Sequence, residues 1–162
     1  MKTLLIMRHA KSSWNDARLS DHDRPLNDRG ELDAPRMGVV LADRDLVPGR
    51  IVSSTAVRAR TTAELVAQNC PFDGEITLDR TLYHAGLDEF VTALQKLPAN
   101  ADCVMLVGHN PGISELVDFL TDIPETMTTA NIAVVRLPID LWSEIDFETE
   151  GELVEVLRPR EG

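Results

Sequence analysis

The sequence predicts an α/β fold whose central strands are largely parallel. Short apolar runs alternate along the chain with segments in which apolar residues recur at helical spacing. The expected strands are residues 2–9, 49–55, 102–109 and 131–137, and the expected helices are residues 26–45, 56–69, 87–97 and 110–120. No repeat or Gly/Ser-rich linker divides the chain, so we expect a single domain over residues 1–162.

The first strand and helix are marked by an apolar run and a capping residue. The segment "KTLLIM" reads as a buried strand that ends at Arg8 and His9. The helix over 26–45 can be capped by Asn27 or Asp28, and several of its apolar residues fall on one helix face.

The next elements continue the alternation. Residues 49–55 form a short apolar strand that ends in hydroxyl side chains. Alanine and valine residues line one side of the helix expected over 56–69. The segment "LDEFVTALQKL" (87–97) is amphipathic, and Pro98 stops it as a helix.

The second half of the chain again has a strand followed by a helix, and it ends in a predicted hairpin. The segment "DCVMLVGH" (102–109) reads as a buried strand, and Pro111 suits the first turn of the helix behind it. Residues 143–159 are expected to form a hairpin that turns at Glu150-Gly151 and lies at the edge of the sheet.

Composition excludes several classes of protein. The net charge of −11 disfavours nucleic acid as a partner, because phosphate backbones attract basic surfaces. No apolar run approaches the roughly 18 residues of a membrane span. The apolar start of the chain is too short for a secretory signal, so we expect a cytoplasmic protein. Cys70 and Cys103 match neither a zinc site nor a disulfide framework and are expected to be reduced thiols.

Histidines and arginines follow the ends of the predicted strands. Arg8 and His9 end the first strand, His109 ends a central one, and Arg58 or Arg60 follows a third. The carboxyl ends of neighbouring parallel strands lie at one edge of a sheet, where such folds bind ligands. Two imidazoles and at least two guanidiniums are therefore expected to face one pocket.

This set of side chains suits phosphoryl transfer without a metal or cofactor. Arginine can hold phosphate oxygens with two parallel hydrogen bonds. A neutral imidazole can attack phosphorus and form a covalent intermediate. A second, protonated histidine would stabilise negative charge on the phosphoryl oxygens, and helix N-termini near Ala56 and Asn110 would add backbone donors.

Four segments carry a family resemblance. They are "RHAKSSWN" (8–15), "DRPLNDRG" (23–30), "SSTAVRARTTAE" (53–64) and "VGHNPGI" (107–113). In this order they resemble the "RHG", "PLT-x-x-G", "S-x-x-x-R-A-x-x-T-A" and second-histidine segments of the histidine phosphatase (phosphoglycerate mutase-like) superfamily, in particular its short bacterial SixA-type branch of phosphohistidine phosphatases. The resemblance implies a three-layer α/β/α sandwich with a mostly parallel central sheet and an antiparallel edge.

The resemblance also implies roles for individual residues. His9 would be the nucleophile that becomes phosphorylated, and Arg8, Arg58 and His109 would surround the phosphoryl group. Asn15 would contact the same group from the first loop.

Three positions depart from the family pattern. Ala10 stands where most members have glycine, which requires a negative φ there. Lys11 replaces an acidic residue typical of the mutases and either assists anion binding or is solvated. His84 occupies the place of a glutamate that protonates alkoxide leaving groups in many larger members. It either donates a proton near neutral pH or lies at the pocket rim without a role.

The sequence therefore predicts a metal-independent phosphatase that hydrolyses a phosphohistidine on a partner protein through phospho-His9. The absence of a carboxylic acid at the position of His84 favours a labile P–N bond, and the short chain leaves little sequence to roof the pocket. The alternatives are a phosphatase of small phosphorylated metabolites and a non-catalytic module that binds phosphorylated ligands. His22 is given no role, and Trp14 and Trp142 are expected to be packing residues.

Overall fold

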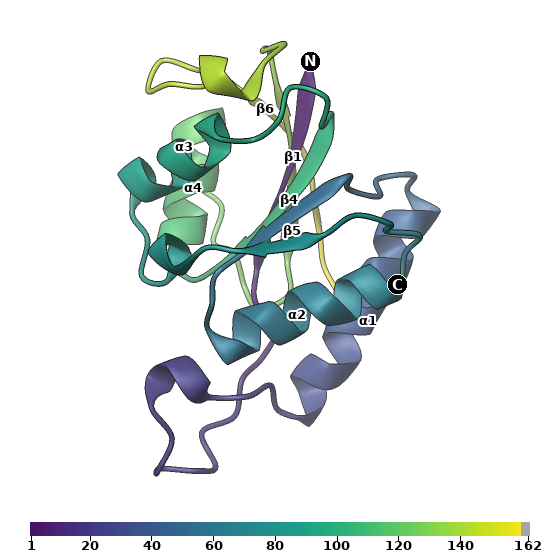
Figure 1. The fold of residues 1–162 in the computed structure, drawn as a ribbon, viewed down its shortest axis with the longest axis vertical. Coiled ribbons are helices and arrows are strands. Elements are labelled where there is room, and N and C mark those ends of the chain that lie inside the picture. The colour runs from purple at the N-terminus through teal and green to yellow at the C-terminus, as the bar shows by residue number, and fades with distance from the viewer. Residues whose placement is uncertain (160–162) are drawn as a thin grey trace.

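A six-stranded mixed sheet lies at the centre of the computed structural model, which describes residues 1–159 (Figure 1). The strands are β1 (Lys2–Arg8), β2 (Arg50–Ser53), β3 (Ile76–Leu78), β4 (Cys103–Gly108), β5 (Ile132–Leu137) and β6 (Glu152–Leu157). Their order is β3-β2-β4-β1-β5-β6. The four strands from β3 to β1 are parallel, whereas β5 and β6 are antiparallel to their neighbours. The predicted parallel centre and antiparallel edge are confirmed.

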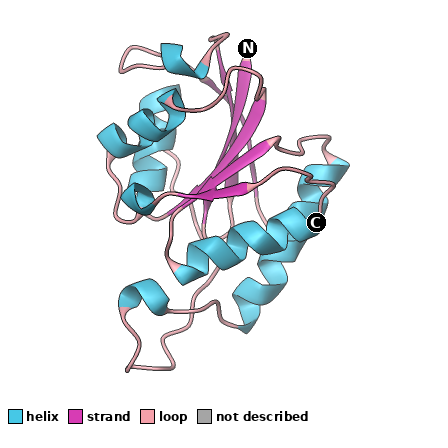
Figure 2. Ribbon diagram, viewed as in Figure 1, coloured by secondary structure: helices cyan, strands magenta, loops and turns pink. Residues whose placement is uncertain are grey.

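Helices cover both faces of the sheet, which makes three layers (Figure 2). They are α1 (Asp28–Asp43), α2 (Val57–Gln68), α3 (Leu87–Gln95) and α4 (Gly112–Thr121), with three 3-10 turns, η1 (Asp21–Asp23), η2 (Arg80–Leu82) and η3 (Trp142–Glu144). The pair α1 and α2 packs on one face, and α3 and α4 pack on the other. The Asn27 side chain caps α1 by accepting the Gly30 N–H at 2.9 Å. Among residues 1–159, no helix is long and apolar enough to cross a membrane.

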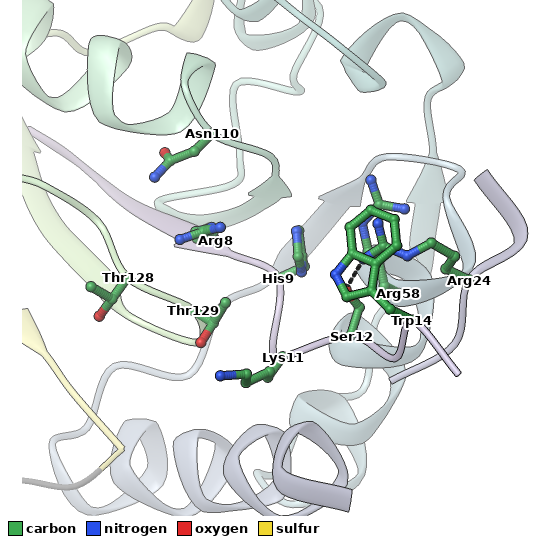
Figure 3. A pocket seen from close by; sticks show the side chains of 10 residues that line it. All are labelled: Arg8, His9, Lys11, Ser12, Trp14, Arg24, Arg58, Asn110, Thr128 and Thr129. Atoms are coloured by element: carbon green, nitrogen blue, oxygen red, sulfur yellow. Dashed lines mark hydrogen bonds between the residues drawn. The ribbon is translucent and has the colours of Figure 1, made fainter. Parts of the chain in front are cut away.

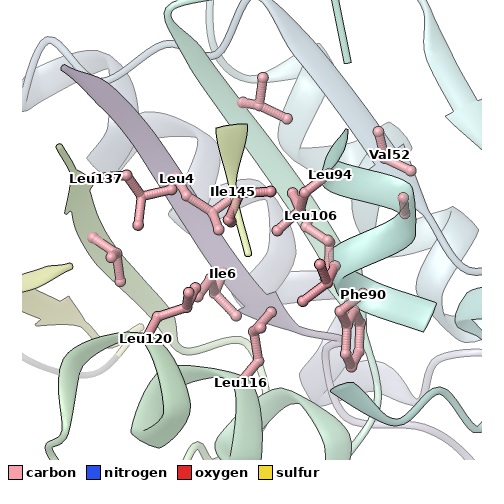
Figure 4. Close-up of a cluster of buried hydrophobic side chains, with 14 of the residues drawn as sticks. Leu4, Ile6, Val52, Phe90, Leu94, Leu106, Leu116, Leu120, Leu137 and Ile145 are labelled. Atoms are coloured by element: carbon pink, nitrogen blue, oxygen red, sulfur yellow. The ribbon is translucent and has the colours of Figure 1, made fainter. Parts of the chain in front are cut away.

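The hydrophobic core is divided by the sheet into two clusters. Along β1, Leu4 and Ile6 face the α3/α4 layer (Figure 4), while Leu5 and Met7 face the α1/α2 layer. This alternation follows from the two-residue period of a strand. A strand that is buried on both faces needs a continuous apolar run, as β1 and β4 have.

A substitution in the first of these clusters is expected to destabilise the fold. Leu106 of β4 is fully buried, so Leu106→Ala should lower the free energy of unfolding by about 2–5 kcal/mol through lost apolar burial and an unfilled cavity. Leu32→Ala is the matched control, because Leu32 is 57% exposed on α1, and a change within about 0.5 kcal/mol is expected there. Urea denaturation measures both, and equal losses would contradict this description of the core.

Two edge elements differ from the expectation. The three-residue strand β3 was not predicted, because it is too short to show a pattern. The predicted hairpin over 143–159 is wrong, although its place at the sheet edge is confirmed by β6, which pairs with β5. The preceding segment is held by burial instead, since Trp142 and Ile145 are fully buried and Trp142 Nε1 donates to the Ala101 carbonyl at 2.6 Å.

Candidate active site

The ends of three parallel strands bring the predicted residues to one edge of the sheet. In the β1/β4 register Arg8 lies opposite Gly108, so His9 and His109 leave the sheet side by side. Their ring centroids are 5.0 Å apart, and the ring planes are inclined by 53°. Arg58 reaches the same place from the first turn of α2, which follows β2. The four side chains come together at this edge, and three of them, Arg8, His9 and Arg58, line one pocket.

A pocket of about 500 Å³ opens beside His9 (Figure 3). Four cationic side chains line it, from Arg8, Lys11, Arg24 and Arg58. The other lining residues are His9, Ser12, Trp14, Asn110, Thr128 and Thr129. In a protein with a net charge of −11, this concentration of positive charge indicates a site for an anion.

The imidazole of His9 is fixed in one orientation and is neutral. It is 7% exposed, and its Nδ1 lies 2.7 Å from the Ala10 carbonyl oxygen. A carbonyl can only accept, so Nδ1 carries the proton and Nε2 keeps its lone pair. Burial lowers the pKa of His9 to about 4, and the charges of Arg58 and Arg8 act in the same direction. A neutral imidazole with a free Nε2 is a competent nucleophile.

The loop after His9 is tied to α2 and α1. The Ala10 N–H donates to Thr62 Oγ1 at 3.0 Å, and Ala10 is outside the set of residues with positive φ, so the methyl group is accommodated as expected. The Lys11 carbonyl accepts the Asn27 N–H at 3.0 Å. A Cβ on Gly30 would overlap that carbonyl, so only glycine permits this approach of α1 to the loop.

His109 is also buried and neutral. Its Nε2 lies 2.8 Å from Ser54 Oγ, and its Nδ1 is buried without a hydrogen-bond partner among the described residues. Burial lowers the pKa of His109 to about 3, helped by the nearby His9 and Arg58. A bound anion would oppose these effects and raise the pKa of His109.

Arg8 and Arg58 retain donors for a ligand. Arg8 Nη1 donates to the Met127 carbonyl at 3.3 Å, while Nε is buried and has no partner among residues 1–159. Burial and the charge of Arg58 lower the pKa of Arg8. Arg58 uses Nη1 and Nη2 to bind Asp21, at 2.7 and 3.0 Å. Its Nε proton is left for the pocket, so each arginine can still bind an oxyanion.

Three predicted site residues lie outside the pocket lining: His109, whose ring stands beside that of His9, and Asn15 and His84. Asn15 is exposed on the loop after Trp14, and its backbone N–H donates to Ser13 Oγ at 3.1 Å. His84 is exposed and has a φ of 59°, and its ring centroid lies 4.0 Å from that of Tyr83. The roles of Asn15 and His84 therefore stay predictions, whereas Lys11 does line the pocket.

Arg24 and Trp14 are pocket residues that the sequence did not reveal. Arg24 is buried, and its Cζ lies 3.3 Å from the ring centroid of Trp14. Trp14, expected to be a packing residue, packs against Arg24 but is 76% exposed, whereas Trp142 is buried as expected. The burial of Arg24 could not be predicted from its polar neighbours in the sequence, because its stacking partner Trp14 comes from another part of the loop.

The acidic turn η1 is also part of the site. Asp21 contacts Arg24, Arg58 and the Tyr83 hydroxyl. His22, which was given no role, is half-buried, with Nε2 2.9 Å from Thr55 Oγ1. This turn reaches the pocket only through tertiary contacts, so sequence spacing could not place it there.

The depressed pKa values predict how stability depends on pH. His9 and His109 stay neutral in the folded protein, whereas in the unfolded chain they bind protons below about 6.5. The unfolded state thus holds more protons as the pH falls from 6.5 toward 4, so stability should fall over that window, by up to about 1.4 kcal/mol per pH unit for each histidine.

Urea denaturation at pH 7 and pH 5 tests this dependence. The variant His9→Asn should lose less stability than the wild type between these two values, because one titrating group is removed. Equal losses in both proteins would show that His9 does not contribute to the pH dependence.

Known proteins resemble this chain in sequence and in structure. The model of the histidine phosphatase superfamily (branch 1) matches residues 4–90. An uncharacterized chloroplastic protein of Arabidopsis thaliana is 31% identical over 154 residues, which cover 88% of this chain and 70% of that protein.

Solved structures share the whole fold. One assigned as the phosphohistidine phosphatase SixA from Nakamurella multipartitia has a TM-score of 0.85 and 27% identity, covering 99% of this chain and 97% of that one. The protein histidine phosphatase SixA complexed with tungstate has a TM-score of 0.82 and 25% identity, covering 97% of both chains.

Proposed function

This chain belongs to the histidine phosphatase superfamily, and on that premise we propose that it hydrolyses a phosphohistidine carried by a partner protein. That the chain is a phosphatase follows from the family and from its SixA neighbours. The observation that carries the finer proposal is His9, a buried neutral imidazole with a fixed Nδ1 proton, in a pocket of four cationic side chains.

The first step transfers the phosphoryl group to His9. The Nε2 lone pair attacks phosphorus, a new N–P bond forms, and the bond between phosphorus and the substrate imidazole breaks. The Ala10 carbonyl, 2.7 Å from Nδ1, stabilises the positive charge that develops on the ring. Arg8 and Arg58 bind the non-bridging oxygens, where negative charge accumulates.

The second step releases phosphate. A water oxygen attacks phosphorus of phospho-His9, the N–P bond breaks, and its electrons return to Nε2. Both water protons leave with the phosphate as dihydrogen phosphate, and the substrate imidazole left in the first step as a neutral ring because its other nitrogen already carried a proton. The sum is phosphohistidine, protonated on the ring, plus water giving histidine plus dihydrogen phosphate. His109, whose pKa a bound anion raises, supports the same oxygens in both steps when it is protonated.

The lining of the pocket supports a labile leaving group. None of the ten lining residues is a carboxylic acid, and the proton donor suggested by the sequence, His84, is exposed beside Tyr83. An alkoxide needs a positioned acid, whereas an imidazole can leave already protonated. We propose that no metal is required, because Arg8, Arg24, Arg58 and Lys11 supply the positive charge.

A competition of substrates tests this proposal. Purified protein, with chelator present, would receive a phosphohistidine-bearing protein and a panel of sugar, glycerate and nucleotide phosphates. We expect kcat/KM for the phosphohistidine to be higher by a factor of about ten or more, which corresponds to about 1.4 kcal/mol in the barrier. Preference for one ester would assign a small metabolite instead, and loss of activity with chelator would contradict the metal-free mechanism.

The cellular place of the reaction is part of the same proposal. We place the enzyme and its partner in the cytoplasm, as the sequence predicts. Fractionation of cells that produce a tagged chain should recover it with cytoplasmic markers, and recovery in another compartment would contradict this.

A further inference from the structure

We propose that Asp21 is a positioning residue that sets two of the three pocket arginines, Arg24 and Arg58, before the phosphoryl group arrives. This proposal rests on the proposed function, because it takes the pocket to be the phosphoryl site. Asp21 does not line the pocket itself. It acts through the side chains that do.

The contact with Arg58 fixes one edge of the guanidinium. Nη1 donates to the Asp21 carbonyl oxygen at 2.7 Å, and Nη2 donates to Oδ2 at 3.0 Å. Both bonds come from the terminal nitrogens, so Nε stays available to the pocket. Arg58 is only 5% exposed, and in this setting two bonds to one residue leave its guanidinium a single orientation.

The second carboxylate oxygen holds the other arginine. Arg24 Nη1 donates to Asp21 Oδ1 at 2.9 Å. Its Nε donates to the Ser13 carbonyl at 3.2 Å, its Nη2 bonds to Ser12 Oγ, and Trp14 covers its face. Each oxygen of Asp21 therefore serves a different arginine, and one carboxylate sets the relative position of both guanidiniums.

Tyr83 extends this arrangement to the second histidine. Its hydroxyl donates to Asp21 Oδ2, and its ring meets that of His109 edge-on, with centroids 5.5 Å apart. Arg58 Cζ lies 6.0 Å from the centroid of the Tyr83 ring. Tyr83 is the single tyrosine in the sequence, and it joins the Asp21 carboxylate to the wall of the site beside His109.

The Asp21 side chain is a carboxylate at neutral pH. The hydrogen bond from Tyr83, followed by the interactions with Arg58 and Arg24, lowers the pKa of Asp21 to about 2. A carboxylate close to an anion site also repels the anion. We expect the ordering of the guanidiniums to outweigh this repulsion. Two long side chains that are already ordered do not lose conformational entropy when the anion binds, so the binding free energy is more favourable.

The test compares two carboxylates of the same turn. Asp21→Ala should raise KM, and the Ki of tungstate, by about tenfold, since hydrogen bonds to charged groups are lost. The fold increase in KM should exceed the fold decrease in kcat. Asp23→Ala is the matched control: it removes the same charge from the same turn, but its ion pair is with His22, so a change of about twofold or less is expected.

Further variants keep the test decisive. Asp21→Asn keeps the shape, and it carries the test if Asp21→Ala does not fold. Tyr83→Phe removes only the hydroxyl and should have a smaller effect than Asp21→Ala. A role in folding alone would lower kcat through the folded fraction and leave the Ki of tungstate unchanged.

Two outcomes would overturn the proposal. One is an unchanged Ki in Asp21→Ala, and the other is a lower Ki, which would make Asp21 a competitor for the arginines. Tungstate binding does not depend on which substrate is hydrolysed. If the wild type binds tungstate but does not hydrolyse phosphohistidine, the proposed function fails while the role of Asp21 can still be measured.

Discussion

Replacing His9 with asparagine is expected to lower kcat by about 10⁴-fold or more, the scale seen when a covalent nucleophile is removed. Asparagine has no nitrogen lone pair that can attack phosphorus, so the route through a phosphorylated enzyme is closed. The measurement is the hydrolysis rate at saturating phosphohistidine protein. Tungstate binding serves as the control, because an intact pocket should still bind the oxyanion through Arg8 and Arg58. Activity close to that of the wild type would show that His9 is not the nucleophile.

The second large effect is expected at Arg58. Arg58→Lys should lower kcat/KM by about 10²–10³-fold, because a single lysine ammonium cannot keep both bonds to Asp21 and also donate to a phosphoryl oxygen as the Arg58 guanidinium can. The activation barrier should rise because Arg58 stabilises the transition state, in which the negative charge on the phosphoryl oxygens is greatest.

The matched control is the neighbouring arginine that the sequence offered as an alternative. Arg60 is exposed on α2, with Nε 3.4 Å from Glu64 Oε1, so Arg60→Lys should change kcat/KM by about twofold or less. Equal losses in the two variants would contradict the selection of Arg58 over Arg60.

Strand ends explain why the centre of the site could be predicted. Arg8, His9 and His109 end apolar runs, and parallel strands place their carboxyl ends at one edge. Arg58 follows a third such run by a few residues. Local sequence was sufficient for Arg8, His9 and His109, because the sheet itself determines where strand ends lie. It left Arg58 and Arg60 open, and the family resemblance selected Arg58.

The periphery of the site could not be predicted in the same way. Asp21, Arg24 and Tyr83 sit on irregular turns, and their contacts join residues up to 62 positions apart. No periodicity encodes the path of such a loop, so none of these three residues was predicted to belong to the site. The same limit explains the wrong hairpin, which was predicted from a turn at Glu150-Gly151. The burial of Trp142 and Ile145 instead decided the structure of the preceding segment.

The exposed rim is relevant to the substrate. Trp14 has one face on Arg24 and most of its surface in solvent, at the mouth of the pocket. His84 lies beyond Tyr83 with an exposed ring. A site with such a rim is accessible to a phosphorylated side chain on the surface of another protein, which agrees with the proposed substrate.

In the proposed mechanism, His9 carries the phosphoryl group during turnover. The most direct test of this step is to mix the enzyme with a partner protein bearing labelled phosphohistidine, to quench within the first turnover in base, where the N–P bond survives, and to locate the label by mass spectrometry. Label on His9 that disappears as phosphate is released is the predicted result. Turnover without labelled enzyme, or label on His109 or His84 instead, would contradict the account.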